Sequence, residues 1–289
     1  MRKFFCVVFL CAFISYAYSQ NRKLFFLNEN NSVQNNFVQR NHLSTYVIVS
    51  QGHFVINEKF SKTDLEKIIL KSFPKKYDTG YAVLDWEGSG MQSLIRQNSR
   101  FEYYISEYIK AIEYAKSFRP NVKWSFYGVP YQYYERSVDV YASKIQKLSE
   151  LIKKIDFLAP SLYIMSNETM SAAEKEKIKQ TLSISIKFGL KYSKPVYPFI
   201  WHRIHPSNQK NGISLVNQEI FENHIKYLLD LRYKNIGISG LMWWHSEKYS
   251  YDRKLQNVQV KRAYSAISNF EKFQDDTFDR YYKIIKKYL

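Results

Sequence analysis

The stretch that decides the fold is Gly80-Tyr-Ala-Val-Leu-Asp-Trp-Glu-Gly-Ser-Gly90. Its apolar residues, 81–84, have the pattern of a buried β-strand, and two carboxylates and a glycine-containing turn follow at once. Residues at positions i and i+2 of an extended chain point to the same side, so Asp85 and Glu87 should stand next to each other. In a barrel of parallel strands, the carboxyl ends of the strands carry the active site. The stretch therefore predicts an acidic pair at that edge, although two solvated acids at a strand end would give the same pattern.

Similar apolar runs recur on both sides of this stretch and alternate with helical patterns. The predicted strands cover residues 46–50, 80–86, 123–127, 157–164, 195–200 and 237–244, with 24–27 as a weaker seventh. Between them, apolar residues recur at spacings of three and four in 101–115, 141–155 and 221–228, as on one buried helix face. This alternation predicts an α/β fold, specifically a (β/α) TIM-like barrel of seven or eight strands, in preference to an open doubly wound sheet. Residues 270–289 have the pattern of an amphipathic last helix that packs on the barrel.

The chain is expected to divide into a signal peptide at 1–19, a lead-in segment at 20–45 and a single (β/α)-barrel catalytic domain at 46–289. Arg2 and Lys3 precede an apolar run, and Ala17 and Ser19 stand at positions −3 and −1 of a cut before Gln20. The apolar run is too short to span a bilayer, so no stable membrane insertion is expected. The polar, Asn-rich residues 28–41 suggest a loose lead-in. We expect a secreted or periplasmic monomer.

Charge and cysteine content narrow the chemistry further. There are 43 Lys and Arg against 26 Asp and Glu, which gives a net charge of +17 and predicts a polyanionic partner. Export argues against nucleic acid and favours an acidic polysaccharide. Both cysteines, Cys6 and Cys11, lie in the signal, so the exported chain has no disulfide, cysteine nucleophile or cysteine-bound metal. No glycine-rich phosphate loop follows a strand, and we expect no cofactor.

Three other residues are candidate metal ligands. His202, His205 and Glu222 are of ligating types, but two histidines three apart in an extended segment do not share a face. We therefore expect no metal, and we interpret the histidines as loop or substrate contacts.

Five short motifs occur in one order along residues 46–244. They are Leu84-Asp85-Trp86-Glu87, Phe118-Arg119-Pro120, Trp124-Ser-Phe-Tyr-Gly-Val-Pro130, Pro160-Ser-Leu-Tyr163 and Gly240-Leu-Met-Trp-Trp244. Together they resemble the hyaluronidase family of glycoside hydrolases. The resemblance implies a barrel of about seven strands and no cofactor. It also implies a retaining endo-β-N-acetylhexosaminidase activity, of the hyaluronoglucosaminidase type, on hyaluronan or chondroitin.

The resemblance also assigns the catalytic pair. Glu87 looks like the family's acid/base, and Asp85 looks like the carboxylate beside it. In that family the substrate's own acetamido oxygen attacks the anomeric carbon, so the protein supplies no nucleophile. Neighbouring carboxylates repel each other, which should raise the pKa of one of them and keep it protonated near neutral pH.

Aromatic and basic residues at other predicted strand ends complete the predicted site. Tyr163 matches the family tyrosine that contacts the acetamido group, and Trp244 matches the tryptophan of the pocket wall, with Trp243 as its alternative. Aromatic faces suit the C–H surfaces of sugars, and guanidinium groups pair with carboxylates. The predicted substrate-binding residues are Tyr163, Trp244, Trp243, Trp201, Arg203 and Tyr127. Arg96, Arg100, Arg119 and Arg136 are further candidates for substrate carboxylates.

The sequence departs from the family pattern at several points. Gly88-Ser-Gly-Met91 follows the acid in place of Trp-Arg-Pro, and Ile204 stands where the family has a further acetamido-binding tyrosine. Two alternatives therefore stay open. One is a glycosidase acting on another amino-sugar polymer, chitin-like or peptidoglycan, and the other is a catalytically inactive barrel that binds acidic glycans.

Overall fold

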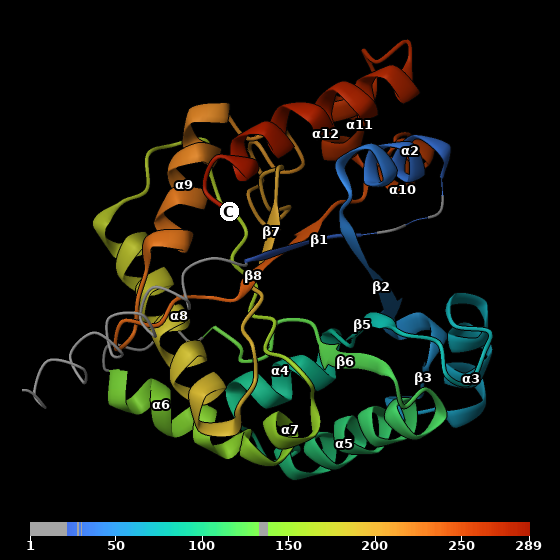
Figure 1. Ribbon diagram of the computed structural model, residues 1–289, viewed down its shortest axis with the longest axis vertical. Helices are drawn as coiled ribbons and strands as arrows, with labels where there is room; N and C mark the ends of the chain where they lie inside the picture. Colours follow the sequence, from blue (N-terminus) through green and yellow to red (C-terminus); the bar gives the residue numbers. More distant parts are fainter. Residues whose placement is uncertain (1–21, 28, 30, 133–137) are drawn as a thin grey trace, which may run out of the picture.

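The computed structural model describes residues 22–289 except 28, 30 and 133–137 (Figure 1). The predicted signal peptide and Arg136 lie outside the described residues. Six strands form one parallel sheet in the order β6-β5-β2-β1-β8-β7. Their bounds are Lys23–Leu27 (β1), Ser44–Ser50 (β2), Gly80–Asp85 (β5), Val122–Phe126 (β6), Phe199–Trp201 (β7) and Gly240–Trp244 (β8).

A segment without regular strand geometry completes the ring between β6 and β7. On the β6 side, the amide of Gly128 donates to the carbonyl of Ala159 over 2.9 Å. On the β7 side, Phe199 donates to Pro160 over 2.8 Å and Leu162 donates to Phe199 over 3.0 Å. Residues 157–164 were predicted as a strand, and they occupy a strand's place with isolated bridges instead of a ladder. The predicted α/β barrel is confirmed, with seven positions around the ring.

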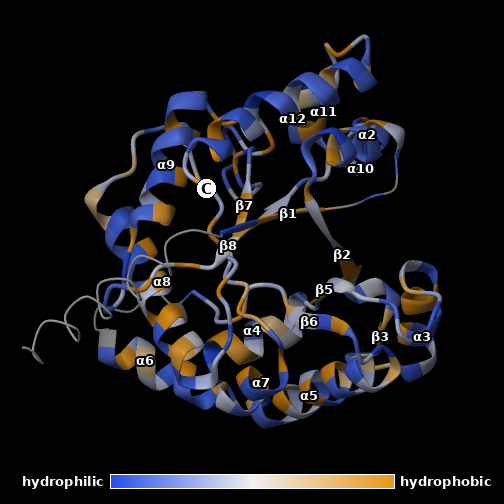
Figure 2. Ribbon diagram, viewed as in Figure 1, coloured by the Kyte–Doolittle hydropathy of each residue, from blue (hydrophilic) through white to orange (hydrophobic). Residues whose placement is uncertain are grey.

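Helices surround the ring, and Figure 2 shows orange and blue alternating along many of them, as expected for helices with one buried face. They are α2 Ser32–Asn41, α3 Lys62–Ser72, α4 Gly88–Arg96, α5 Phe101–Phe118, α6 Val138–Lys147, α7 Ser149–Lys154, α8 Ala172–Tyr192, α9 Gln218–Asp230, α10 Glu247–Asp252, α11 Val258–Tyr264 and α12 Phe270–Lys286. A 3-10 turn, Gln51–His53, and a hairpin, β3 Val55–Ile56 with β4 Lys59–Phe60, follow β2. No helix of the described part of the chain is both long and apolar enough to cross a membrane.

The side-chain alternation of the strands separates two layers of the core. Phe25, Val83 and Met242 belong to a cluster inside the ring. Their neighbours along the strands, among them Phe26 and Trp243, belong to the larger cluster between the strands and the helices. Because side chains of a strand alternate between its two faces, this register fixes which residues at the strand ends reach the barrel mouth.

The predicted lead-in at 20–45 is wrong as a description of this segment. Strand β1 pairs with β2 on one side and with β8 on the other, so the barrel begins at Lys23 and not at Tyr46. Helix α2 follows, capped by the Asn31 side chain, which accepts from the amide of Gln34 over 2.9 Å. Phe37 of α2 is fully buried against Phe26, with ring centroids 5.1 Å apart. This tertiary packing orders a segment whose own sequence is polar.

Candidate active site

A cavity of about 150 Å³ opens at the carboxyl ends of the strands. Its walls are Ile48, Asp85, Glu87, Tyr127, Tyr163, Trp201, His205, Pro206 and Trp244. The structure thus gathers six of the eight predicted site residues from five different places in the chain. Ile48 and Pro206 were not predicted, because an apolar residue in a strand and a proline in a loop carry no chemical signal of their own.

The geometry of the carboxylate pair follows from the end of β5. Asp85 is the last residue of the strand and continues the inward-facing positions set by Val83. Trp86 turns into the core, where its ring stacks on Tyr108 at 4.6 Å and its carbonyl accepts the Tyr108 hydroxyl. Gly88 then takes a φ of 66°, a conformation that favours glycine, and the chain turns into α4. The anchored tryptophan between the two acids directs both of them to the cavity.

The surroundings of the pair raise the pKa values of both carboxyl groups. Burial, with the nearby charge of Glu87 as a second cause, raises the pKa of Asp85 to about 7. The side chain of Glu87 reaches solvent, yet the cavity walls shield it enough to raise its pKa as well. Asp85 Oδ1 has no hydrogen-bond partner among the described residues. Both carboxyl groups are therefore shifted toward their protonated forms, as a general acid at this site requires.

Aromatic rings form the opposite wall. Tyr163 lies 5.7 Å from Trp244 and 6.1 Å from Tyr127 between ring centroids, and Trp201 packs edge-on to Trp244 at 4.4 Å. The Tyr127 hydroxyl donates to Ser161 Oγ over 3.0 Å. Burial raises the pKa of Tyr163 well above its usual value, so its hydroxyl stays protonated and is a hydrogen-bond donor. The wall offers flat apolar surface with one phenolic donor in its middle.

The alternative position Trp243 is excluded by the strand register. Trp244 follows Met242 on the inner face, whereas Trp243 points outward and is fully buried against Phe278 of α12. Its indole N–H donates to His202 Nδ1 over 3.0 Å. Trp243 is therefore a core residue and does not line the cavity.

Arg203 is also not a substrate contact. Its side chain is 1% exposed, and it donates from Nε and Nη2 to both carboxylate oxygens of Glu247 at 2.6 Å. Glu247 also accepts from the hydroxyl of Tyr264 over 2.8 Å and lies 2.8 Å from His202 Nε2. Arg203 and these hydrogen bonds hold the pKa of Glu247 far below its usual value, against the effect of burial. This closed network fixes the segments after β7 and β8. Sequence reasoning missed Glu247 because it lies more than forty residues along the chain from Arg203.

The sequence comparison placed Ile204 at the position of the family's further acetamido-binding tyrosine, but in the structure His205 lines the cavity instead. Ile204 is fully buried in the outer core, and His205 lines the cavity with its ring 6.0 Å from that of Tyr163. The amide of Ser207 donates to His205 Nδ1 over 3.2 Å, so Nδ1 carries no proton and Nε2–H is the donor. Burial lowers the pKa of His205, which favours this neutral form. Because the ring lines the cavity, His205 adds a second neutral donor there.

The remaining arginine candidates within the described residues do not line the catalytic cavity. Arg119 is buried, and its guanidinium donates to the carbonyls of Phe73 and Pro74. Arg100 pairs with Glu58 at 2.8 Å outside the cavity. Arg96 does not line the cavity, and Arg136 lies outside the described residues.

The three candidate metal ligands do not lie together in the structure. His202 bonds to Glu247 and Trp243, whereas Glu222 accepts from Lys287 and Tyr288 on the outer surface. No group of three or more ligating side chains suited to a metal ion occurs within the described ranges.

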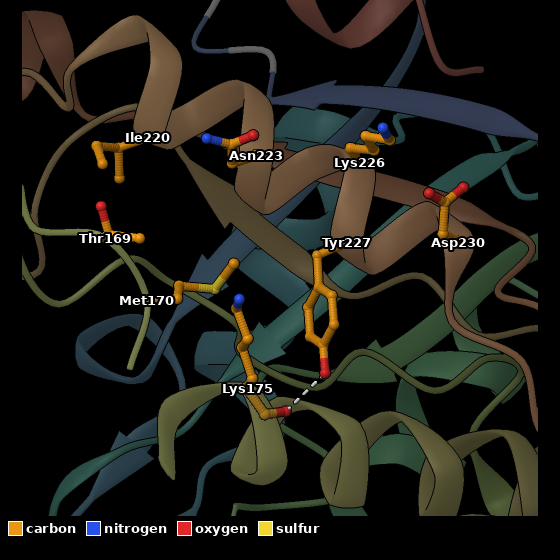
Figure 3. Close-up of a pocket in the computed structure, with 8 residues that line it drawn as sticks. All are labelled: Thr169, Met170, Lys175, Ile220, Asn223, Lys226, Tyr227 and Asp230. Atoms are coloured by element: carbon orange, nitrogen blue, oxygen red, sulfur yellow. Dashed lines mark hydrogen bonds between the residues drawn. The ribbon is translucent and has the colours of Figure 1, made fainter. Parts of the chain in front are cut away.

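A different cavity, of about 340 Å³, lies between α8 and α9 and contains no part of the carboxylate pair (Figure 3). There the Tyr227 hydroxyl donates to the carbonyl of Lys175 over 2.9 Å, and the charged groups are Lys175, Lys226 and Asp230. With no acid pair and no aromatic wall, it lacks the features of a glycan-cleaving site.

Comparisons with known proteins agree on the fold. No protein-family model and no curated protein matches the chain. Bee venom hyaluronidase superposes with a TM-score of 0.60 and 15% identity, over 83% of this chain and 96% of that chain. Its complex with a hyaluronic acid tetramer gives 0.58 and 16%, over 83% and 99%. An engineered protein gives 0.52 and 11%, over 81% and 66%. The chain thus has an α/β barrel similar to that of bee venom hyaluronidase, with an acidic, aromatic-walled cavity at the carboxyl ends of its strands.

Proposed function

We propose that this protein is a glycoside hydrolase that cleaves β-linked N-acetylhexosamine bonds with retention of configuration. One observation carries the proposal: a coupled pair of carboxylates with raised pKa values faces a wall of aromatic rings at the carboxyl end of a barrel. The barrel's similarity to bee venom hyaluronidase supports it. An inactive binding barrel is less well supported, because binding needs no protonatable pair.

Glu87 is the acid/base in this proposal. It donates a proton to the glycosidic oxygen as the bond to the anomeric carbon breaks, while the substrate's acetamido oxygen forms a bond to the same carbon. Glu87 then removes a proton from the water that attacks the anomeric carbon. That attack breaks the bond to the acetamido oxygen and leaves the product with retained configuration.

Asp85 and Tyr163 orient the acetamido group. The unpartnered Oδ1 of Asp85 accepts a hydrogen bond from the acetamido N–H, which satisfies a buried polar atom. The Tyr163 hydroxyl donates to the acetamido oxygen, and Trp244 with Trp201 packs against the sugar and its methyl group. Each of these contacts is strongest when the acetamido group is held close to the anomeric carbon.

The proposal also covers the glycan that is cleaved and the location of the protein. Hyaluronan and chondroitin, cut internally, are the substrates that the family resemblance supports. Chitin-like glycans and peptidoglycan are the alternatives. We propose that the protein acts after export, as a secreted or periplasmic monomer, because its first 19 residues have the pattern of a signal peptide.

A reducing-end assay on the purified protein tests the reaction. The substrates are hyaluronan, chondroitin, chitin oligosaccharides and peptidoglycan, each with the parent protein, Glu87→Gln and the control Glu176→Gln. Glu176 is an exposed residue of α8 paired with Lys179. Glu87→Gln is expected to lower kcat/KM by about 10²- to 10⁴-fold through loss of the proton donor. The control should match the parent protein. Equal activity of Glu87→Gln, or no new reducing ends from any substrate, would overturn the proposal.

A further inference from the structure

A second and larger cavity adjoins the catalytic one. It has a volume of about 410 Å³ and shares Tyr163 and His205 with the catalytic cavity. Residues 161–166, helix α8 and helix α9 supply most of its remaining walls. A glycan bound across the carboxylate pair would pass the shared Tyr163 and His205 and extend into this space.

The charged groups around the two cavities are mostly acids. Glu168 and Glu174 line the larger cavity, in addition to Asp85 and Glu87 in the smaller one. Glu174 is held in place by the α8 capping box, in which it accepts from the amide of Ser171 over 2.8 Å. Among the described lining residues, Lys177 is the single lysine or arginine.

The histidines of the larger cavity do not change this balance. His205 is a neutral donor, as its bond from the Ser207 amide requires. His224 is fully buried with Nε2 2.9 Å from the carbonyl of Leu162, and burial lowers its pKa to about 4. Both rings are therefore uncharged at neutral pH.

The rest of the lining is apolar or neutral. Met165, Met170, Ile178 and Ile220 present aliphatic and thioether surface to the larger cavity. Such surface suits sugar faces and N-acetyl methyl groups. A uronate carboxylate in the same place would lose hydration and face Glu168 and Glu174, with Lys177 as the one cation among the described lining residues.

From this lining we infer that the cleft selects an uncharged, N-acetylated glycan over a uronate-containing one. The inference rests on the proposed glycosidase function, and within it favours the chitin-like alternative over hyaluronan and chondroitin. The polymer that fits is a run of N-acetylhexosamine units without carboxylates.

The test compares two polymers that differ only in charge. Native hyaluronan and carboxyl-reduced hyaluronan, in which each carboxylate is a hydroxymethyl group, have the same linkages. At pH 7 and low salt, kcat/KM is expected to be at least 10-fold higher for the reduced polymer. The gap should narrow as salt rises, because salt screens the repulsion.

Two acid-to-amide changes test whether the acids of the larger cavity cause the selection. Glu168→Gln with Glu174→Gln removes both charges, and glutamine can keep the capping box intact. The ratio of kcat/KM for native over reduced polymer is expected to rise about 5-fold or more. The matched control Glu176→Gln, on the same helix but outside the cavity, should leave the ratio unchanged.

The outcomes separate this inference from the proposed reaction. Faster or equal cleavage of native hyaluronan, dependent on Glu87, would overturn the inference and leave the reaction standing. If neither polymer is cut, calorimetric titration of each hyaluronan tetrasaccharide, native and reduced, into Glu87→Gln protein decides. Tighter binding of the reduced tetrasaccharide supports the inference while the reaction fails, and equal or tighter binding of the native one overturns it.

Discussion

The two ends of the barrel carry opposite charge. At the carboxyl end, the two adjoining cavities are lined by Asp85, Glu87, Glu168 and Glu174 against the single Lys177 among the described residues. At the amino end, a cavity of about 660 Å³ is lined by Arg22, Lys23, Lys194 and Arg232, with no acid in its described lining. The comparison teaches that a net charge of +17 says nothing about the sign at the site.

The largest effect is expected at Arg203, whose buried guanidinium pairs with Glu247 and does not line the catalytic cavity. Arg203→Met leaves Glu247 buried without its partner, which should lower the free energy of unfolding by about 3–5 kcal/mol in urea denaturation. A double variant with Glu247→Leu should recover much of this loss, because no lone charge remains buried. Unchanged stability with a raised KM for acidic glycans would instead place Arg203 on the substrate and break the comparison.

Asp85→Asn should lower kcat/KM by about 10²-fold, because a neutral amide oxygen accepts the acetamido N–H more weakly than a carboxylate oxygen does. The parent protein should show an ionisation near pH 7 in its pH profile of kcat/KM, from the raised pKa of Asp85. The variant should lack it. A pH profile of the same shape in both proteins would mean that the two carboxylates are not coupled.

The same substitution has a stability consequence with a defined sign. The pKa of Asp85 is about 7 in the folded protein and 3.8 in the unfolded chain, so the folded protein binds a proton more tightly. The free energy of unfolding therefore falls as pH rises from about 4 to 7. Asp85→Asn should remove this loss and stabilise the protein above pH 7 by up to about 4 kcal/mol. Thermal unfolding of both proteins at pH 5 and pH 8 measures it, and a difference at pH 5 alone would contradict it.

Tyr163→Phe should lower kcat/KM by about 10- to 100-fold through loss of the phenolic donor. Tyr227→Phe is the matched control, because its hydroxyl bonds to a backbone carbonyl in the separate cavity of Figure 3. The control should retain the parent kcat/KM. Equal losses in both variants would show that phenol removal acts through stability instead of through the site.

The smallest effect is expected at the amino end. Lys23→Gln with Lys194→Gln removes two of its cations, and kcat/KM for native and reduced hyaluronan should each stay within about twofold of the parent. A lower kcat/KM for native hyaluronan alone would show that the basic amino end contributes to substrate capture. The carboxyl end would then not be the only end that meets the glycan.

Much of the site could be predicted from sequence because strand period and strand order are local signals. The alternation in 81–87 placed Asp85 and Glu87 together, and the structure confirms that they share one cavity with Tyr163 and Trp244. The choice between Trp243 and Trp244 needed the register of β8, which only the neighbouring strands define. Helix α2 was missed because its stability comes from Phe37 packing on Phe26 and Phe278, contacts that no local pattern records.

Arg203 was misassigned for a related reason. A basic residue just after a strand end has the same sequence signature whether it faces a substrate or a buried partner. The partner Glu247 follows β8, and the two meet only because β7 and β8 are neighbours in the sheet. Pairings that depend on strand order in space are therefore the part of the site that sequence alone could not supply.

The position of β1 between β2 and β8 also determines when the catalytic cavity can form during synthesis of the chain. Lys23 pairs with Gly240, so the first strand of the ring cannot complete its hydrogen bonding until the last one has been synthesised. The carboxylates of β5 are made long before that moment, but Trp244 arrives with the closing strand. Closure of the ring thus depends on a pairing between the two ends of the barrel sequence, and a growing chain holds its acids without a complete cleft until the ring closes.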